Sequence, residues 1–147
     1  MNFRKGIGAI ILNSKRKIIG FQRSDYRSNW QAPEGGLEEG ETEIDGIYRE
    51  LNEEVGITKD DVILLSETKD FYRYYFAYPN KFGQDGQDKK FFLFKLKDDN
   101  FEFKFDTKKD EIEFSDYKEF DGEELLKVVP PFKKLFYKKI LTEFRLL

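Results

Sequence analysis

The sequence of 147 residues contains no cysteine and no histidine. Without cysteine the chain forms no disulfide and has no thiol chemistry, which fits a reducing compartment and predicts a cytoplasmic protein. The chain also lacks the sulfur and nitrogen ligands of the usual zinc sites. Any metal bound by this chain must therefore be held by oxygen atoms, which are the ligands that hard cations prefer.

Long apolar segments are missing as well. No stretch of about 20 apolar residues is present to cross a bilayer, so we expect no membrane partner. Residues 1–12 lack the apolar core and cleavage site of a signal peptide. The formal charge is only −3 although 37% of the residues are charged. This balance does not indicate bulk nucleic-acid binding and is compatible with a local basic site. No obligate protein partner is evident, and the oligomeric state stays open.

Aromatic residues, in contrast, are abundant, with 16 phenylalanines and 8 tyrosines. The length predicts a single domain over residues 1–147, and much of its core must be aromatic. Apolar runs between turn residues predict strands at residues 6–12, 17–23, 62–68, 70–78, 89–96, 101–105 and 112–120. A short helix is expected to begin at residue 122, and an amphipathic helix is expected over residues 132–146.

One segment, residues 35–57, combines helix signals with a cluster of acids. Thr42 is suited to cap the start of a helix, and Gly56 is suited to end it in a left-handed turn. Three glutamates at positions i, i+3 and i+4 predict one acidic helix face, formed by Glu50, Glu53 and Glu54. The apolar positions of the same helix share another face and are expected to be buried: Ile44, Ile47, Leu51 and Val55.

Three carboxylates on one helix face repel each other, which costs stability unless a cation binds them. Oxygen ligands suit Mg²⁺ or Mn²⁺, and protein-bound magnesium usually completes its shell with waters and substrate phosphates. The segment therefore indicates metal-assisted chemistry on a phosphate compound. The alternative is an acidic helix face that is merely solvated.

The segment resembles the Nudix box, G-x5-E-x7-R-E-U-x-E-E-x-G-U with U aliphatic. Every fixed position is filled, by Gly35, Glu41, Arg49, Glu50, Leu51, Glu53, Glu54, Gly56 and Ile57. The resemblance implies an α+β fold, a Nudix-type α/β/α sandwich with a central mixed β-sheet, the box helix and a C-terminal helix. It implies hydrolysis of a diphosphate linked to another moiety, with metal held by Glu50, Glu53 and Glu54, steadied by Arg49 and joined by the carbonyl of Gly35.

The sequence WQAPEGG, which overlaps the start of the box, narrows the resemblance. It is similar to the Nudix branch of RNA pyrophosphohydrolases and dinucleoside polyphosphate hydrolases, with Glu34 in place of the usual glutamine. The implied substrate is a nucleotide or an RNA 5′ end. The first expectation is removal of pyrophosphate from 5′-triphosphorylated RNA. The second is cleavage of dinucleoside polyphosphates such as diadenosine tetraphosphate, and the third is a nucleotide-binding module with little turnover.

The resemblance also implies site residues outside the box. Glu113 is expected to be a fourth acid, as metal ligand or general base, with Glu111 as its rival. The residues expected to bind substrate are Arg4, Arg23, Arg27, Tyr75, Phe132 and Lys133. A lysine can meet a phosphate as a point charge, and a phenylalanine can stack on a base. The alternative for each is ordinary: a solvated charge or an aromatic side chain that packs the fold.

Overall fold

The computed structural model describes residues 1–105 and 112–147. The strands are β1 (Phe3–Leu12), β2 (Ile18–Arg23), β3 (Trp30–Gln31), β4 (Glu34–Gly36), β5 (Val62–Glu67), β6 (Tyr72–Tyr75), β7 (Gly86–Leu96) and β8 (Phe114–Phe120). The α-helices are α1 (Glu43–Val55), α2 (Gly122–Val128) and α3 (Lys134–Glu143), and the 3₁₀ helices are η1 (Lys59–Asp61) and η2 (Pro131–Lys133).

The strands form a mixed sheet at the centre of the molecule. Its main path runs β3-β2-β1-β7-β5, while β4 pairs with β1, β6 with β7, and β8 with β2. The long central strands β1 and β7 are parallel, from the pair Phe3 and Gly86 to the pair Leu12 and Lys95. The other pairings are antiparallel. The α+β class with a mixed sheet is confirmed.

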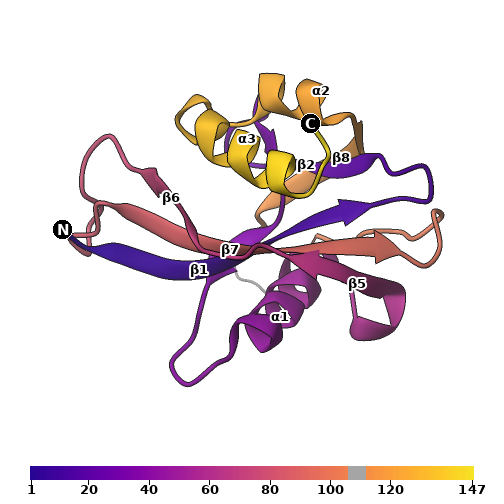
Figure 1. The fold of residues 1–147 in the computed structure, drawn as a ribbon, viewed down its shortest axis with the longest axis horizontal. Helices are drawn as coiled ribbons and strands as arrows, with labels where there is room; N and C mark the ends of the chain where they lie inside the picture. The colour runs from indigo at the N-terminus through magenta and orange to yellow at the C-terminus, as the bar shows by residue number, and fades with distance from the viewer. Residues whose placement is uncertain (106–111) are drawn as a thin grey trace.

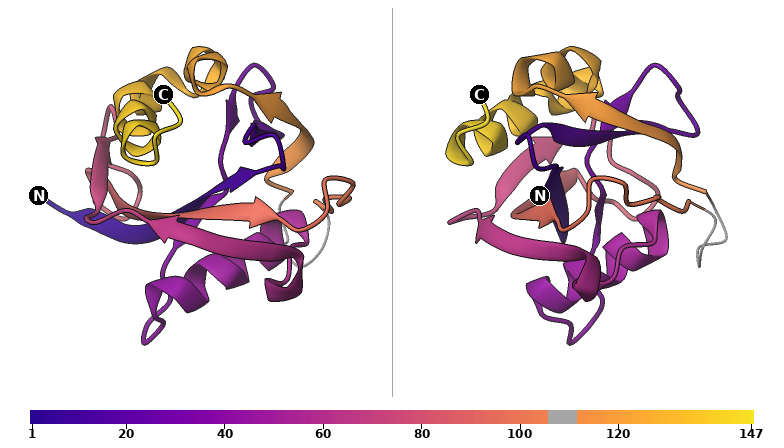
Figure 2. Two further views of the ribbon diagram at one scale, coloured as in Figure 1. Left: turned by 45° about the vertical axis from the view of Figure 1, so that its right-hand side comes forward. Right: turned by 90° about the vertical axis from the view of Figure 1, so that its right-hand side faces the viewer.

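Helices cover both faces of this sheet, with α1 on one side and α2 and α3 on the other (Figures 1 and 2). The apolar residues of β1 therefore alternate between two cores. Ile7, Ala9 and Ile11 belong to the core beneath α1, and Ile10 and Leu12 belong to the core beneath α2 and α3. Burial on both faces explains why this strand is a continuous apolar run.

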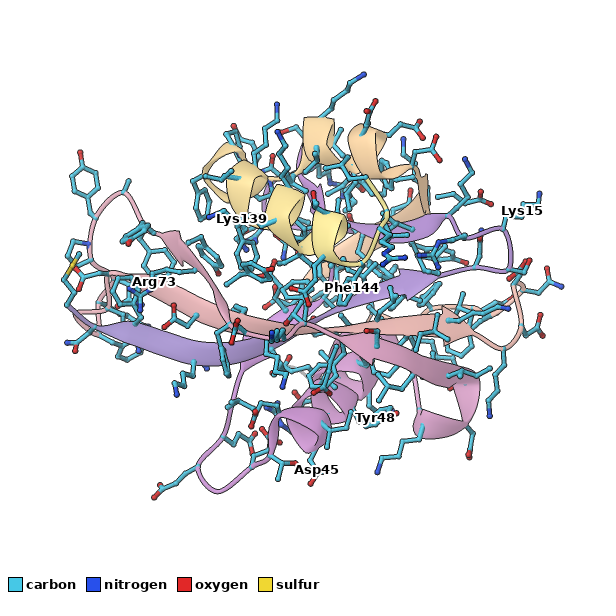
Figure 3. The ribbon with its side chains drawn as sticks, in the orientation of Figure 1. Lys15, Asp45, Tyr48, Arg73, Lys139 and Phe144 are labelled. Carbon is cyan, nitrogen blue, oxygen red and sulfur yellow. The ribbon has the colours of Figure 1, made fainter. Side chains whose placement is uncertain are left out.

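The two helix layers use their aromatic residues in the same way. Tyr48 of α1 contacts Phe94 of β7 with ring centroids 5.5 Å apart. Phe144, just after α3, is buried in the opposite core, whereas Lys139 on α3 is exposed. Figure 3 labels Tyr48, Phe144 and Lys139. A largely aromatic core, as composition predicts, therefore fixes the helices to the sheet.

Helix α1 has the ends that the sequence predicts. The side-chain oxygen of Thr42 accepts a hydrogen bond from the backbone N–H of Asp45 at 3.3 Å. Gly56 has a φ of 78°, the left-handed conformation that favours glycine. Ile47, Leu51 and Val55 are fully buried, and Ile44 packs against the same core. These local features fix where the acidic helix face begins and ends.

The strand predicted at residues 101–105 is wrong, because residues 101–104 have no regular structure and residue 105 is a bend. The alternating phenylalanines are explained by core packing instead. Phe103 is buried, and its ring lies 5.0 Å from that of Phe21. The backbone N–H of Lys104 donates to the carbonyl of Val55 at 3.0 Å, at the end of α1. This segment therefore caps the helix rather than extending the sheet.

The C-terminal helix is shorter than its apolar periodicity predicts. Instead of one helix over residues 132–146, the structure has η2 (Pro131–Lys133) followed by α3 (Lys134–Glu143). Pro130 and Pro131 prevent regular α-helical hydrogen bonding at this start. In the described part of the chain, every helix is too short or too polar to cross a bilayer.

Candidate functional site

A polar cavity of about 360 Å³ opens beside β4, where α1, β1, β6 and η2 approach each other. Eight of its lining residues are expected site residues: Arg4, Arg23, Gly35, Glu50, Glu54, Glu113, Phe132 and Lys133. A larger hollow of about 530 Å³ lies between α2 and the C-terminal residues and contains none of the expected residues. The chemistry predicted from the sequence therefore belongs to the smaller cavity.

Arg49 joins the acidic residues of the α1 segment. Its guanidinium lies 2.7 Å from the Glu41 carboxylate, 2.8 Å from Glu50 and 3.2 Å from Glu53, and it donates to the carbonyl of Gly36 at 2.9 Å. The hydrogen bond to Glu41 raises the pKa of Arg49, and the same bond lowers the pKa of Glu41. Arg49 therefore fixes the positions of the carboxylates and offsets their repulsion.

Two glycines of β4 allow the site to close. A Cβ on Gly35 would lie 2.1 Å from Cδ of Glu50, far inside van der Waals contact. A Cβ on Gly36 would lie 1.8 Å from a guanidinium nitrogen of Arg4. With glycine at both positions, the Glu50 carboxylate and the Arg4 guanidinium lie against the β4 backbone, and a larger residue at either position would displace one of these side chains.

Oxygen donors gather at the α1 side of the cavity. The side chains of Glu50 and Glu54 are buried and line the cavity together with Gly35. Glu53 does not line the cavity and instead contacts Arg49. Over residues 1–105 and 112–147, no three acidic side chains are arranged as a preformed metal site. The donor set consists of carboxylate and carbonyl oxygens, which fits a hard divalent cation.

The cavity wall also contains a buried cluster around Glu34. Its carboxylate lies 3.3 Å from the ammonium of Lys133 and 3.4 Å from that of Lys89, and it accepts a hydrogen bond from the hydroxyl of Tyr137. Burial raises the pKa of Glu34, but the charges of Lys133 and Lys89 and the hydrogen bonds from Tyr137 and Lys133 together outweigh this effect, so the net pKa lies below its ordinary value. Burial lowers the pKa of Lys89. Glu34 is therefore an ionised, paired carboxylate.

Arg23 and Glu113 lie at another part of the cavity wall. Arg23 forms an ion pair with Asp25 at 2.7 Å and donates to the amide oxygen of Gln31 at 3.2 Å. Glu113 is exposed, and its backbone carbonyl accepts a hydrogen bond from the N–H of Ser24 at 2.9 Å. The structure thus brings the expected fourth acid to the same cavity as Glu50 and Glu54. Glu111 lies outside the described residues.

Two expected substrate contacts do not line the cavity. Arg27 is exposed, and its backbone carbonyl accepts a hydrogen bond from the Gln22 side chain. Tyr75 is 55% exposed and packs its ring edge-on against Phe3, with centroids 5.4 Å apart. Tyr74, its neighbour on β6, lines the cavity instead, because successive strand residues point to opposite faces.

Sequence reasoning missed Lys89 and Tyr137. Lys89 could have been found from strand alternation, because it is in phase with Phe91 and Leu93, which face the core beneath α2 and α3. Its pairing with Glu34 has no local signal, since the partners are far apart in sequence. Tyr137 lies on the apolar face of α3 and is fully buried, which resembles an ordinary core position.

Comparison with known proteins gives one family and a set of relatives. The NUDIX domain model matches residues 2–144. A Nitratiruptor protein named RNA pyrophosphohydrolase is 38% identical over 152 residues, covering 97% of this chain and 94% of the relative. A protein of the same name from Francisella tularensis subsp. mediasiatica is 32% identical over 149 residues, with coverage of 97% and 94%.

Solved structures share the fold. A Caenorhabditis elegans Ap4A hydrolase in a binary complex aligns with a TM-score of 0.71 at 19% identity, covering 97% of this chain and 98% of that one. An Escherichia coli dihydroneopterin triphosphate pyrophosphohydrolase aligns with a TM-score of 0.73 at 18% identity, with coverage of 97% and 99%. At these identities the likeness concerns the arrangement of sheet and helices.

Proposed function

Because the chain belongs to the Nudix family, we propose that it is a metal-dependent pyrophosphohydrolase that removes pyrophosphate from the 5′-triphosphate end of RNA. Relatives named RNA pyrophosphohydrolase support this choice, since they align with 97% of the chain at 32–38% identity. The observation that carries the proposal is the polar cavity lined by Glu50, Glu54, Gly35 and Arg4. The cavity combines oxygen ligands for a metal ion with the positive charge of Arg4, which can bind phosphate.

The metal that we propose is Mg²⁺ or Mn²⁺, since Nudix hydrolases generally use divalent metals and this donor set is all oxygen. Glu50, Glu53 and Glu54 would hold it with the carbonyl of Gly35. When bound, such an ion neutralises phosphate charge and lowers the pKa of a water molecule. Arg49 keeps the carboxylates in place through its ion pairs with Glu50 and Glu53 and its hydrogen bond to the Gly36 carbonyl.

Other residues of the cavity bind substrate and move a proton. Arg4 binds phosphate oxygens, and Arg23 contributes positive charge at the wall next to Glu113. Glu113 accepts a proton from the attacking water. The oxygen of this water forms a bond to the α-phosphorus of the RNA end, and the bond between that phosphorus and the leaving pyrophosphate breaks. Phe132, which is 55% exposed at the cavity, stacks on the terminal base. Arg27 and Tyr75 contact RNA outside the cavity.

A second candidate reaction is cleavage of dinucleoside polyphosphates. The exposed ring of Phe132 is compatible with it, because stacking on a base does not depend on the group at the far end of the phosphate chain. A nucleotide-binding module without turnover is the weakest candidate, because every fixed position of the box is present. A cytoplasmic location stays a prediction from the lack of cysteine.

The test is a substrate panel with Mg²⁺ and with Mn²⁺. Triphosphorylated RNA, diadenosine tetraphosphate and free nucleoside triphosphates are each incubated with the protein, and the products are identified by chromatography. We expect pyrophosphate to be released from RNA at the highest kcat/KM. Excess chelator should abolish release.

Glu39→Gln is the matched control for a site substitution such as Glu54→Gln. Glu39 is an exposed acid of the loop before α1 and lies outside the cavity. The control removes the same charge as a site substitution and should retain the wild-type rate. Two results would refute the proposal: faster turnover of a free nucleoside triphosphate than of RNA, or undiminished turnover in excess chelator.

A further inference from the structure

The position and partners of Glu34 have a consequence for how the cavity takes up phosphate. The Glu34 side chain is only 3% exposed, and the side chains of Lys89 and Lys133 are 4% and 6% exposed. Lys133 has further contacts, to the amide oxygen of Gln31 at 3.5 Å and above the ring of Tyr74 at 4.8 Å. A carboxylate this deeply buried is stable only because these charged and hydroxyl partners surround it.

The partners of Glu34 are also typical ligands of a phosphate group. Two ammonium groups and a phenolic hydroxyl donate to oxygen anions, and a phosphate oxygen would satisfy all three as a carboxylate oxygen does. Here the carboxylate belongs to the protein itself and comes from β4, the strand that also carries Gly35. The donors are therefore already engaged before any substrate enters.

We propose that Glu34 acts as an internal anion that occupies the donors Lys89, Lys133 and Tyr137 and so keeps substrate phosphate from binding to them. This inference rests on one part of the proposed function, namely that the cavity binds a phosphate chain. It changes the role expected for Lys133, whose ammonium holds Glu34 rather than phosphate.

The phosphate chain is then left with the cations that Glu34 does not engage. Arg4 lines the cavity, and among the described residues no carboxylate lies within ion-pair distance of its guanidinium. Consequently, Glu34 weakens the binding of a phosphate chain in the cavity, and replacing it by a neutral residue strengthens binding.

The experiment measures the affinity of the full chain for inorganic tripolyphosphate by isothermal titration calorimetry in excess EDTA. We expect Glu34→Gln to bind about tenfold more tightly than wild type, because one negative charge is lost and two lysines become available. Glu39→Gln removes the same charge outside the cavity and should bind like wild type. A gain in affinity separates this role from a structural one, since damage to the fold does not strengthen binding.

Lys133→Met provides the second test. In the Glu34→Gln background it should cancel most of the gain, whereas in the wild-type background it should change affinity by less than about twofold, because Lys133 is already engaged. If Glu34→Gln fails to fold, the single Lys133→Met variant decides, once its thermal unfolding shows that it is folded with Lys89 as the remaining lysine partner of Glu34. The proposal is overturned if Glu34→Gln binds no more tightly than wild type, or if Lys133→Met alone weakens binding about tenfold.

These outcomes are independent of turnover. A gain in Glu34→Gln with no hydrolysis of RNA by wild type would remove the proposed reaction and support the internal anion. If wild type hydrolyses RNA but Glu34→Gln shows no gain in affinity for tripolyphosphate, the proposed reaction is supported and the role of Glu34 as an internal anion is refuted.

Discussion

A single methyl group at Gly35 should displace Glu50, an expected metal ligand. In Gly35→Ala the new Cβ would lie 2.1 Å from Cδ and 2.4 Å from Oε1 of Glu50, whereas ordinary contacts begin at 3.4 Å. Glu50 and β4 must therefore separate by more than about 1 Å, and a misplacement of that size costs on the order of 10²-fold in rate. Overpacking should also lower the free energy of unfolding by about 1–3 kcal/mol.

The assay for Gly35→Ala is kcat/KM for pyrophosphate release from 5′-triphosphorylated RNA with Mg²⁺, measured beside thermal unfolding. Gly40→Ala is the matched control. Gly40 has a φ of 77° and no atom within 4 Å of the added Cβ, so its replacement strains the backbone without touching the site. We expect it to lose about 1 kcal/mol of stability and to keep its rate. A Gly35→Ala protein with kcat/KM within threefold of wild type would refute the steric argument, because about 10²-fold is expected.

Other residues of the α1 segment give three more predictions. Glu53→Gln and Glu54→Gln should each lower the rate of pyrophosphate release by on the order of 10²–10⁴, measured with RNA in Mg²⁺, and a rate near wild type would exclude the residue from the chemistry. The pKa of Glu41 is lowered by its bond to Arg49, so the stability it contributes is present above about pH 4.3 and is lost as the pH falls through the depressed pKa. Thermal unfolding of wild type and Glu41→Gln should therefore differ at pH 7 and converge in acid, and a constant difference would contradict the pairing. Thr42→Ala should lower the free energy of unfolding by about 1 kcal/mol in urea titrations, and no change would argue against its cap.

The parts of the fold that the sequence predicts correctly are those determined by local physics. Helix α1 begins after Thr42 and ends at Gly56 because a side-chain cap and a left-handed glycine act within a few residues. Strands β1 and β7 are recognisable because each is a long apolar run that must be buried on both faces. The position of the acidic face on α1 follows from helical spacing alone.

The parts that the sequence did not predict depend on distant partners. Residues 101–105 alternate like a strand, but Phe103 packs against Phe21, and the described residues of this segment pair with no strand. From the sequence alone, Glu34 adds a negative charge near the box. The structure shows that Lys89 and Lys133, which lie on β7 and η2, neutralise it. No periodicity within β4 encodes those contacts.

The affinity of the protein for Mn²⁺, determined by calorimetry without substrate, decides whether this cavity is the metal centre. The carboxylates of Glu50 and Glu54 line the same cavity, and we propose that together they hold the divalent cation. Glu54→Gln should therefore bind Mn²⁺ at least about tenfold more weakly than wild type, and Glu39→Gln should bind it equally well. Equal affinity in wild type and Glu54→Gln would show that the cation binds elsewhere.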